Sequence, residues 1–281
     1  MASIKDKLLA IGVALAYPQV RLKPAIIKEH FSGKWVLVTG ASHGIGRALT
    51  EKLIDADANV FLIARSEAEL QYLCDRAKQR GNRADYCAID LRDREKLELL
   101  CQKLRETLPQ LDYFFCNAGK SIHRKITDAL DRLHDYDRTI DLNYRALVAL
   151  SLALLPALKA SKGSIIYSSS VSTRYPMAPG WSAYHASKSA ANTWCETANS
   201  EFSPLGVRVQ IAYLPLVHTA MSDVNERYRQ LPAYYPADAA NILLRLAIRK
   251  GKRYQPWWAK LSAPIAYLFA PIVHLFYKRM V

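Results

Sequence analysis

The sequence predicts an α/β protein in which a single doubly wound parallel sheet carries helices on both faces. Of the 281 residues, 51% are hydrophobic and 23% are charged, which suits one large globular domain with a sizeable core. Short apolar runs typical of buried strands alternate with longer segments of helical apolar spacing, and a glycine-rich turn separates the first strand from the first helix. Strands and helices that alternate at these lengths form right-handed βαβ units, which place parallel strands side by side.

The expected strands are short and rich in apolar and aromatic residues, and they span residues 34–39, 60–64, 84–89, 111–116, 164–170 and 207–214. The expected helices have apolar residues at three- and four-residue spacing, and they span residues 47–58, 66–80, 94–108, 135–160 and 182–202. Gly81 stops the second of these helices. No repeat or low-complexity linker splits the series, so we expect one domain over residues 34–250, an apolar extension over 1–33 and a basic, apolar segment over 251–281.

Charge and cysteine content narrow the partner and the compartment. The formal net charge of +14 predicts an anionic partner, which could be nucleic acid, a phosphate-rich cofactor or a lipid surface. Aromatic residues interleave with the dispersed basic residues only near 253–258, so we expect no nucleic acid. The cysteines form an odd set without a CxxC pair: Cys74, Cys87, Cys101, Cys116 and Cys195. This pattern predicts reduced thiols in a cytosolic setting rather than disulfides or a zinc site.

The segment TGASHGIG, residues 39–46, lies where a dinucleotide-binding fold carries its phosphate turn. Gly40, Gly44 and Gly46 permit positive φ and let the backbone approach a pyrophosphate, whose charge the N-terminus of the following helix stabilises. The spacing is GxxxGxG rather than GxGxxG, and a purely structural turn is the alternative.

The residue at the end of the second strand predicts which dinucleotide binds. The sequence there is IARSE, with Arg65 where an acidic residue would bind the ribose 2′-hydroxyl of NAD. An arginine can pair with a 2′-phosphate instead, so we expect NADP(H); an ordinary exposed arginine is the alternative. His43 and Arg47 could add positive charge beside the phosphates.

Tyr184 and Lys188, in the segment YHASK, are four residues apart and share one face of a helix. At about 5 Å and an effective dielectric constant near 20, an ammonium stabilises a phenolate by roughly 3 kcal/mol, which lowers its pKa by about 2 units. The pair is therefore a candidate for proton transfer near neutral pH. A surface Tyr/Lys pair is the alternative on these five residues alone.

Together, TGASHGIG, the pair Asp90-Leu91, NAG at 117–119, Asn143, the serine-rich strand end and YHASK resemble the short-chain dehydrogenase/reductases. The resemblance covers residues 34 to 250, keeps the family's motif order, and implies a Rossmann-type fold. It also implies that Tyr184 is the general acid for carbonyl reduction, that Lys188 lowers the pKa of Tyr184 and binds the nicotinamide ribose, and that Asn143 holds a water in a proton path. An asparagine that only caps a helix irregularity is the alternative for Asn143.

The family serine that polarises the substrate carbonyl corresponds to Ser170. Ser170 stands fourteen positions before the tyrosine, where thirteen is commoner, so Ser169 and Ser172 remain alternatives. A one-residue insertion within 171–181 is the preferred explanation.

The resemblance also implies a set of residues that contact NADPH. Asp90 would touch the adenine and Asn117 would fix the strand beside the cofactor, while Leu216 replaces a family glycine in the segment PLVHT. The full expected set is Gly40, Ser42, His43, Gly44, Ile45, Gly46, Arg65, Asp90, Leu91, Asn117, Ala118, Gly119, Tyr184, Lys188, Pro215, Val217 and Thr219.

Two stretches, 119–144 and 213–221, resemble bacterial long-chain fatty acyl-CoA reductases of this family, so a fatty acyl-CoA or fatty aldehyde is the first expected substrate. Reductases of 3-ketosphinganine, retinoids or steroids are alternatives, and an NADPH-binding sensor or scaffold without turnover is an alternative of another class. His123 and His134 have no third ligand nearby, so no metal site is expected.

The chain ends predict a lipid surface as partner. Residues 249–260 are basic and include two tryptophans, and the apolar run 261–277 would cover about 25 Å as a helix against a hydrocarbon core of about 30 Å, with Pro264 and Pro271 interrupting it. We therefore expect a segment that lies in the membrane interface of a cytoplasmic protein; a flap over its own core or a dimer contact is the alternative. The run 8–17 is also too short to span, and secretion is not expected. The resemblance implies a homodimer or homotetramer formed through helices at 138–160 and 182–203.

Overall fold

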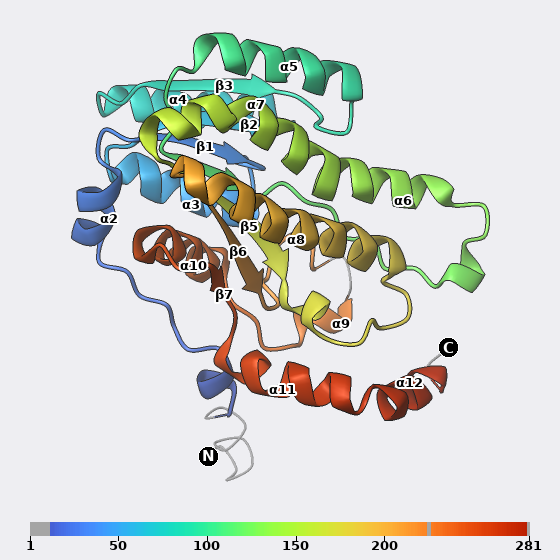
Figure 1. Cartoon of the computed structure of the whole chain (residues 1–281). Helices are drawn as coiled ribbons and strands as arrows, with labels where there is room; N and C mark the ends of the chain where they lie inside the picture. Colours follow the sequence, from blue (N-terminus) through green and yellow to red (C-terminus); the bar gives the residue numbers. More distant parts are fainter. Residues whose placement is uncertain (1–11, 224–225, 280–281) are drawn as a thin grey trace.

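A computed structural model describes residues 12–223 and 226–279. Seven parallel strands form one sheet in the order β3-β2-β1-β4-β5-β6-β7 (Figure 1). Their bounds are β1 Trp35–Thr39, β2 Asn59–Ala64, β3 Ala84–Ala88, β4 Tyr113–Cys116, β5 Ser164–Ser170, β6 Arg208–Leu214 and β7 Arg253–Tyr254. From β1 to β3 the chain builds outward in one direction and from β4 to β7 in the other, so the order reverses between β1 and β4. The predicted doubly wound, Rossmann-type α/β fold is confirmed.

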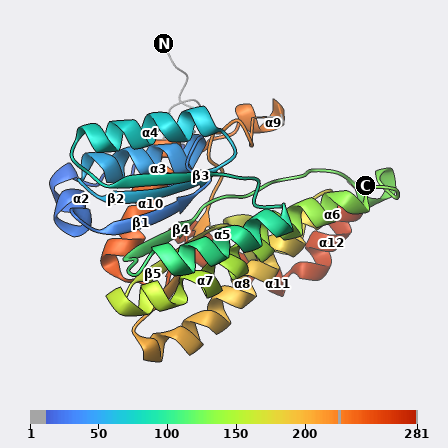
Figure 2. The ribbon, with the colours of Figure 1, turned by 90° about the horizontal axis from the view of Figure 1, so that it is seen from above.

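Helices cover both faces of the sheet, as Figure 2 shows from above. The helices are α2 Pro24–Phe31, α3 Gly44–Asp55, α4 Glu67–Gln79, α5 Arg94–Thr107, α6 Leu133–Ile140, α7 Ala146–Ser161, α8 Ser182–Phe202, α9 Glu226–Arg229, α10 Pro236–Arg249, α11 Trp257–Leu268 and α12 Ala270–Lys278. One buried cluster joins α3, α4 and α10 to the sheet, and a second joins α5, α7 and α8 to the opposite face. Two separate apolar layers therefore hold the strands in place, and the candidate site lies at the carboxyl ends of these strands.

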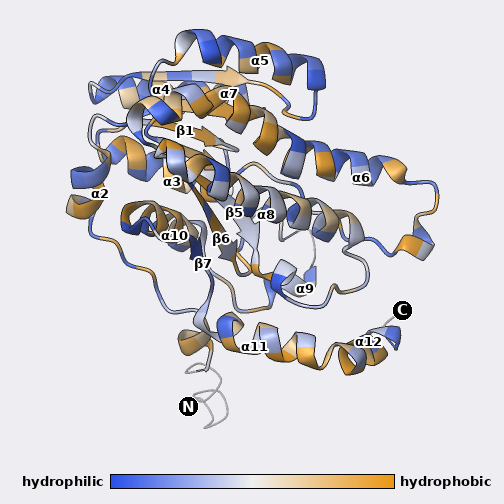
Figure 3. Cartoon of the chain, in the orientation of Figure 1, coloured by the Kyte–Doolittle hydropathy of each residue, from blue (hydrophilic) through white to orange (hydrophobic). Residues whose placement is uncertain are grey.

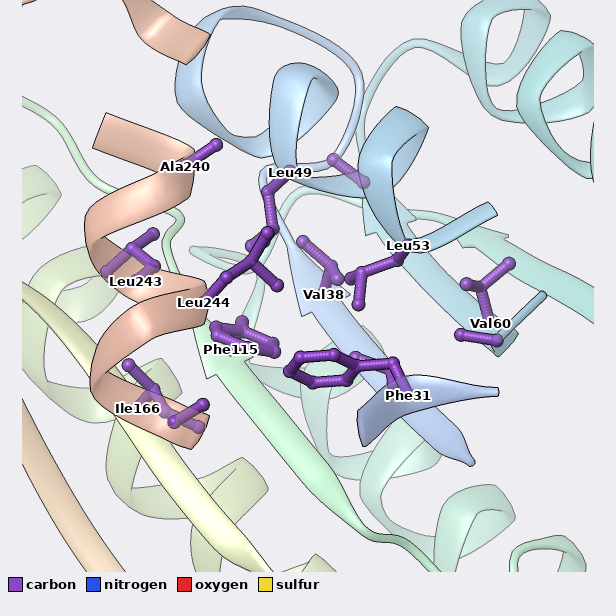
Figure 4. Close-up of a cluster of buried hydrophobic side chains, with 14 of the residues drawn as sticks. Phe31, Val38, Leu49, Leu53, Val60, Phe115, Ile166, Ala240, Leu243 and Leu244 are labelled. Atoms are coloured by element: carbon purple, nitrogen blue, oxygen red, sulfur yellow. The ribbon is translucent and has the colours of Figure 1, made fainter. Parts of the chain in front are cut away.

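Both chain ends add to this core beyond residues 34–250. Phe31 of α2 is fully buried and lies 4.7 Å, centroid to centroid, from the ring of Tyr113 in β4. It packs in the first cluster with Val38 and Phe115 (Figure 4). Burying one phenylalanine side chain contributes about 1.5–3 kcal/mol. At the other end, Arg253 and Tyr254 add β7 to the edge of the sheet.

The predicted long helix at 135–160 has an irregular middle. α6 and α7 are joined by a π-helical turn, Asp141–Arg145, and together they run from Leu133 to Ser161. In the described part of the chain this is the one unbroken helix long and apolar enough to cross a membrane, and half of its most apolar window is buried against the protein. Its apolar character is accounted for by packing on the sheet.

The C-terminal segment forms two helices, α11 and α12, which meet at 81° (Figure 1). Pro264 lies within α11, so it does not interrupt that helix as expected; the break comes at Phe269, just before Pro271 in the first turn of α12. Both helices carry many hydrophobic residues (Figure 3), and several of these are exposed, among them Leu268 with 76% and Phe276 with 62% of its surface exposed. Residues 8–11 of the N-terminal apolar run lie outside the described residues.

Candidate active site

The glycine-rich turn follows β1 and leads directly into the N-terminus of α3. Gly40 and Gly44 have φ of 67° and 53°, a region that residues with side chains rarely adopt. A Cβ on Gly46 would lie 2.0 Å from the carbonyl oxygen of Gly40, and one on Gly44 would lie 3.2 Å from Cγ2 of Thr219. The turn is therefore a close backbone cradle at a helix N-terminus, with Thr219 from the loop after β6 beside it.

Thr39 locks the end of β1 to the end of β4. Its Oγ1 accepts hydrogen bonds from the backbone N–H groups of Asn117, at 3.0 Å, and Ala118, at 3.1 Å. The Asn117 side chain in turn lies close to Gly40 and Gly46. The sequence analysis did not single out Thr39, although a buried threonine at a strand end beside a glycine turn is a usable signal.

Charged groups at the ends of β2 and β3 are arranged only partly as expected. Arg65 is exposed, and its charge helps to lower the pKa of Asp90, although the hydrogen bonds from Arg92 lower it most. The Arg92 guanidinium donates to both carboxylate oxygens of Asp90. Arg47, expected to add positive charge at the turn, instead pairs with Glu51 and Glu69 at 3.1 and 2.6 Å. The charge of Arg47 is therefore compensated by these two carboxylates.

The remaining predicted cofactor contacts surround the turn. His43 Nδ1 lies 2.9 Å from Ser42 Oγ, just before Gly44 begins α3. Ile45 lies in the first turn of α3, and Leu91 is buried in the second cluster. After β6, Pro215 is buried and Val217 forms an isolated bridge with Tyr234. The substitution of glycine by Leu216 thus leaves an ordered loop, since the Tyr234 N–H donates to the Leu216 carbonyl at 3.0 Å.

Tyr184 and Lys188 both project from α8 into the protein interior. A Cβ on Gly119 would lie 3.4 Å from Lys188 Nζ and 3.3 Å from Asn143 Oδ1, so these three residues converge at the end of β4. Lys188 Nζ donates to the Ser168 carbonyl at 2.8 Å and lies 4.7 Å from the centre of the Tyr167 ring. Burial lowers the pKa of Lys188 to about 8.

The pKa of Tyr184 is raised, not lowered. Burial is the largest cause, and the hydrogen bond with Ser170 opposes it. The Lys188 ammonium is directed at the Ser168 carbonyl, so the expectation that it lowers the pKa of Tyr184 stays a prediction. Ser170, rather than the lysine, is the group that favours the phenolate form.

The three candidate serines have different partners. Ser170 forms a hydrogen bond with Tyr184, whereas Ser169 Oγ donates to Asn192 at 2.6 Å. Ser172 Oγ lies 2.8 Å from Ser170 Oγ, and the Ser172 N–H donates to the same oxygen at 3.3 Å. Of the three, Ser170 is the serine in contact with the tyrosine.

The hydrogen-bonded chain continues from Ser172 to His185. His185 Nε2 lies 3.1 Å from Ser172 Oγ, which gives the order Tyr184, Ser170, Ser172, His185. The ring is 5% exposed, burial lowers its pKa, and Nδ1 has no hydrogen-bond partner among the described residues. The sequence analysis missed this link, since neighbours along a helix point in different directions and only the turn after β5 brings Ser172 to His185.

Asn143 is buried within the π-helical turn. Its Nδ2 donates to the Lys120 carbonyl and to Ser187 Oγ, both at 2.9 Å, while its Oδ1 accepts from the Lys120 N–H at 2.8 Å. The irregular turn therefore holds the loop after β4 against α8. Such π-helical turns occur frequently at functional sites.

Several aromatic rings pack beside Tyr184. Trp181 lies edge-on to Tyr184, with ring centroids 5.9 Å apart, and stacks on Tyr228 of α9 at 5.8 Å. His123 is exposed and packs on Trp181, and His134 lies 3.4 Å from Asp135. Within the described residues no group of three potential ligands could hold a metal ion.

Residues 34–229 match the family model for short chain dehydrogenases. The chain belongs to the short-chain dehydrogenase family. It is 33% identical over 251 residues to a fatty acyl-CoA reductase of Acinetobacter baylyi, covering 89% of this chain and 84% of that protein. It is also 33% identical over 241 residues to a fatty acyl-CoA reductase of Mycobacterium tuberculosis, covering 85% and 82%.

A short-chain dehydrogenase from Sphingobium yanoikuyae in complex with NADPH has the same fold as this family member. The TM-score is 0.73 at 25% identity, over 86% of this chain and 95% of that one. A metagenomic short-chain oxidoreductase in complex with NADP matches with a TM-score of 0.65 at 28% identity, over 78% and 91%. The sequence-based family resemblance is therefore confirmed.

Proposed function

We propose that this short-chain dehydrogenase uses NADPH to reduce the carbonyl of a long-chain lipid, with a fatty acyl-CoA or fatty aldehyde as first substrate. The observation that carries the proposal is the contact between Tyr184 and Ser170 beside Lys188. This contact lies at the carboxyl ends of the strands, where the glycine-rich turn is also found. The two fatty acyl-CoA reductases among its relatives support the substrate class.

The residues present fit NADPH. The cradle of Gly40, Gly44 and Gly46 has no room for side chains and opens at the N-terminus of α3, which suits a pyrophosphate. Exposed Arg65 at the end of β2 suits a 2′-phosphate. Asp90, Asn117 and the loop from Pro215 to Thr219 would hold the remainder, as the sequence predicts. When bound, NADPH supplies the hydride.

The side chains supply binding, orientation and the proton. A tyrosine is protonated at neutral pH and burial raises the pKa of Tyr184 further, so its hydroxyl can donate a proton to the developing alkoxide of the substrate. Ser170 donates a hydrogen bond toward the same oxygen, which stabilises charge that develops there. Lys188 and Asn143 stabilise the backbone around the site. Lys188 donates to the Ser168 carbonyl, and Asn143 accepts from the Lys120 N–H. Reduction of an acyl-CoA thioester would give a hemithioacetal that separates into an aldehyde and a free thiol.

We also propose that the protein lies at the inner face of a membrane in the cytoplasm. It would form a homodimer or homotetramer paired through the helices at 138–160 and 182–203. Support for the membrane comes from the outward-facing Leu268 and Phe276, together with exposed Trp257 and Lys260. Replacing Leu268 and Phe276 by glutamate should release the protein from vesicles into the supernatant, because each insertion contributes about 1.5–3 kcal/mol. Equal sedimentation of the variant and the unaltered protein would contradict membrane attachment.

The decisive experiment follows NADPH oxidation with palmitoyl-CoA, hexadecanal and 3-ketosphinganine side by side. We expect turnover of palmitoyl-CoA or hexadecanal and a fall of about 10²- to 10⁴-fold in Tyr184→Phe, with NADPH binding retained. Preference for 3-ketosphinganine, or for a steroid or retinoid ketone, would reassign the substrate. Saturable NADPH binding without turnover of any carbonyl would indicate a sensor or scaffold.

A further inference from the structure

A cavity of about 420 Å³ lies between the turn after β5 and helix α11. The turn is a short 3-10 helix, Val171–Arg174, and it supplies Thr173 and Arg174. Gln255 and Lys260 come from the C-terminal segment. The cavity therefore lies between the turn that follows Ser170 and the C-terminal segment that the proposed function assigns to the membrane surface.

The polar lining of this cavity is rich in hydrogen-bond donors and carries two cations. Arg174 and Lys260 both line it, and none of the described residues around the cavity is acidic. The Arg174 guanidinium lies 5.1 Å from the centre of the Tyr213 ring, which fixes its position. Because no acidic side chain of the described residues lines the cavity beside them, the charges of Arg174 and Lys260 can act on an anionic ligand there.

The cavity is coupled to the reaction centre through one residue. Thr173 Oγ1 donates to the Ser170 carbonyl at 2.8 Å and accepts from Asn192 at 3.0 Å. Arg174 is four residues from Ser170, so the cavity and the carbonyl site are at most about 14 Å apart along the chain. This separation is short enough for one extended ligand to contact both places.

We propose that this cavity binds a phosphate ester, with Arg174 as the bidentate partner and Lys260 as the second cation. Arginine matches the geometry of phosphate oxygens, and a lysine adds a mobile point charge. The apolar part of the wall, Ala263 and Pro264, suits the non-phosphate part of the ligand. Two sources share this chemistry: the CoA portion of the substrate, which rests on the proposed function, and the head group of an anionic phospholipid.

The test measures binding rather than turnover. Titration calorimetry with CoA and co-sedimentation with phosphatidylglycerol or phosphatidylcholine vesicles are compared between the unaltered protein and the double variant Arg174→Gln/Lys260→Gln. Arg249→Gln/Lys252→Gln removes the same charge from two exposed residues outside the cavity and serves as the matched control. The single variant Lys260→Gln changes only an exposed side chain and leaves Arg174 in place, so it tests the cavity even if the double variant fails to fold.

If CoA is the source, the double variant weakens CoA binding by about tenfold or more, Lys260→Gln weakens it by less, and the control stays within about twofold. Vesicle binding then falls equally in the double variant and the control. If phospholipid is the source, sedimentation with phosphatidylglycerol falls more in the double variant than in the control, and CoA binding is unaffected. CoA and vesicle binding that do not distinguish the double variant from the control would overturn the proposal.

This design separates the cavity from the proposed function. Should CoA binding fall in the double variant while no acyl-CoA is reduced, the site stands and the substrate assignment fails. Should palmitoyl-CoA be reduced while the double variant has an unchanged KM for it, the substrate assignment stands and the site fails. Hexadecanal, which has no phosphate, should show an unchanged KM in every variant.

Discussion

The substitution His185→Leu tests whether the hydrogen bonds that link Ser170 to Ser172 and His185 contribute to the reaction. With the proton on Nε2, His185 donates to Ser172, Ser172 donates to Ser170, and the Ser170 proton is directed at Tyr184 or the substrate oxygen. The other tautomer would bury an unpaired N–H at Nδ1, which is rarer in proteins than an unpaired acceptor. The structure therefore favours the tautomer that orients the Ser170 hydroxyl toward the reaction centre.

The size of the effect follows from one lost hydrogen bond. Leucine removes the hydrogen-bond donor to Ser172, and the loss of one such bond should raise the activation free energy by about 0.5–1.5 kcal/mol. We therefore expect kcat to fall about 2- to 13-fold. Because leucine also removes a buried nitrogen without a partner, we expect no loss of thermal stability. A fall in kcat at equal stability separates positioning from a structural role.

Stopped-flow reduction of hexadecanal with saturating NADPH measures kcat and its solvent deuterium isotope effect. We expect the isotope effect to rise in His185→Leu, because proton donation becomes a larger part of the barrier, while the Kd for NADPH is unchanged. His185→Gln keeps a donor and should restore most of the rate. Ser172→Ala and the combined variant Ser172→Ala/His185→Leu should share one kcat, since both break the same series of hydrogen bonds. Additive losses, or an unchanged kcat in His185→Leu, would refute the reasoning.

Three further outcomes follow from the geometry. Burial lowers the pKa of Lys188 from 10.5 to about 8, so the unfolded chain binds more protons than the folded protein between these pH values. The free energy of unfolding should therefore rise by about 3 kcal/mol between pH 8 and pH 10.5. Urea titrations should show that Lys188→Met loses this rise, and an equal rise in both proteins would argue against the explanation. Replacing Arg65 by glutamine should raise the Kd for NADPH about tenfold or more and leave that for NADH nearly unchanged, as fluorescence titration would show, and equal changes for both cofactors would exclude a 2′-phosphate contact. Gly46→Ala should abolish NADPH binding, because its Cβ meets the Gly40 carbonyl, whereas Gly251→Ala, whose Cβ would have ordinary contacts, should bind as the unaltered protein does; retained binding in Gly46→Ala would disprove the cradle.

Sequence reasoning succeeded where the cause is local. Six strands were expected from short apolar runs, and their parallel order follows from the handedness of βαβ units. The glycines of the turn were found because backbone conformation and close approach limit the residue type at each position. The spacing of Tyr184 and Lys188 likewise placed both on one side of a helix. β7 has two residues and α2 has eight, too little local pattern to be recognised before their packing on the core is known.

By itself, the sequence determined the fold class, the position of the glycine turn and the placement of Tyr184 and Lys188 on one helix, because periodicity and backbone sterics act over a few residues. Tertiary structure alone decided which charges remain available. Arg47 is paired with Glu51 and Glu69, whereas Arg174 keeps an unpaired donor. It also decided that Ser170 contacts Tyr184 and that Lys188 is directed at the Ser168 carbonyl. Hydrogen bonds and pKa values depend on atoms brought together from distant parts of the chain, and burial sets their strength.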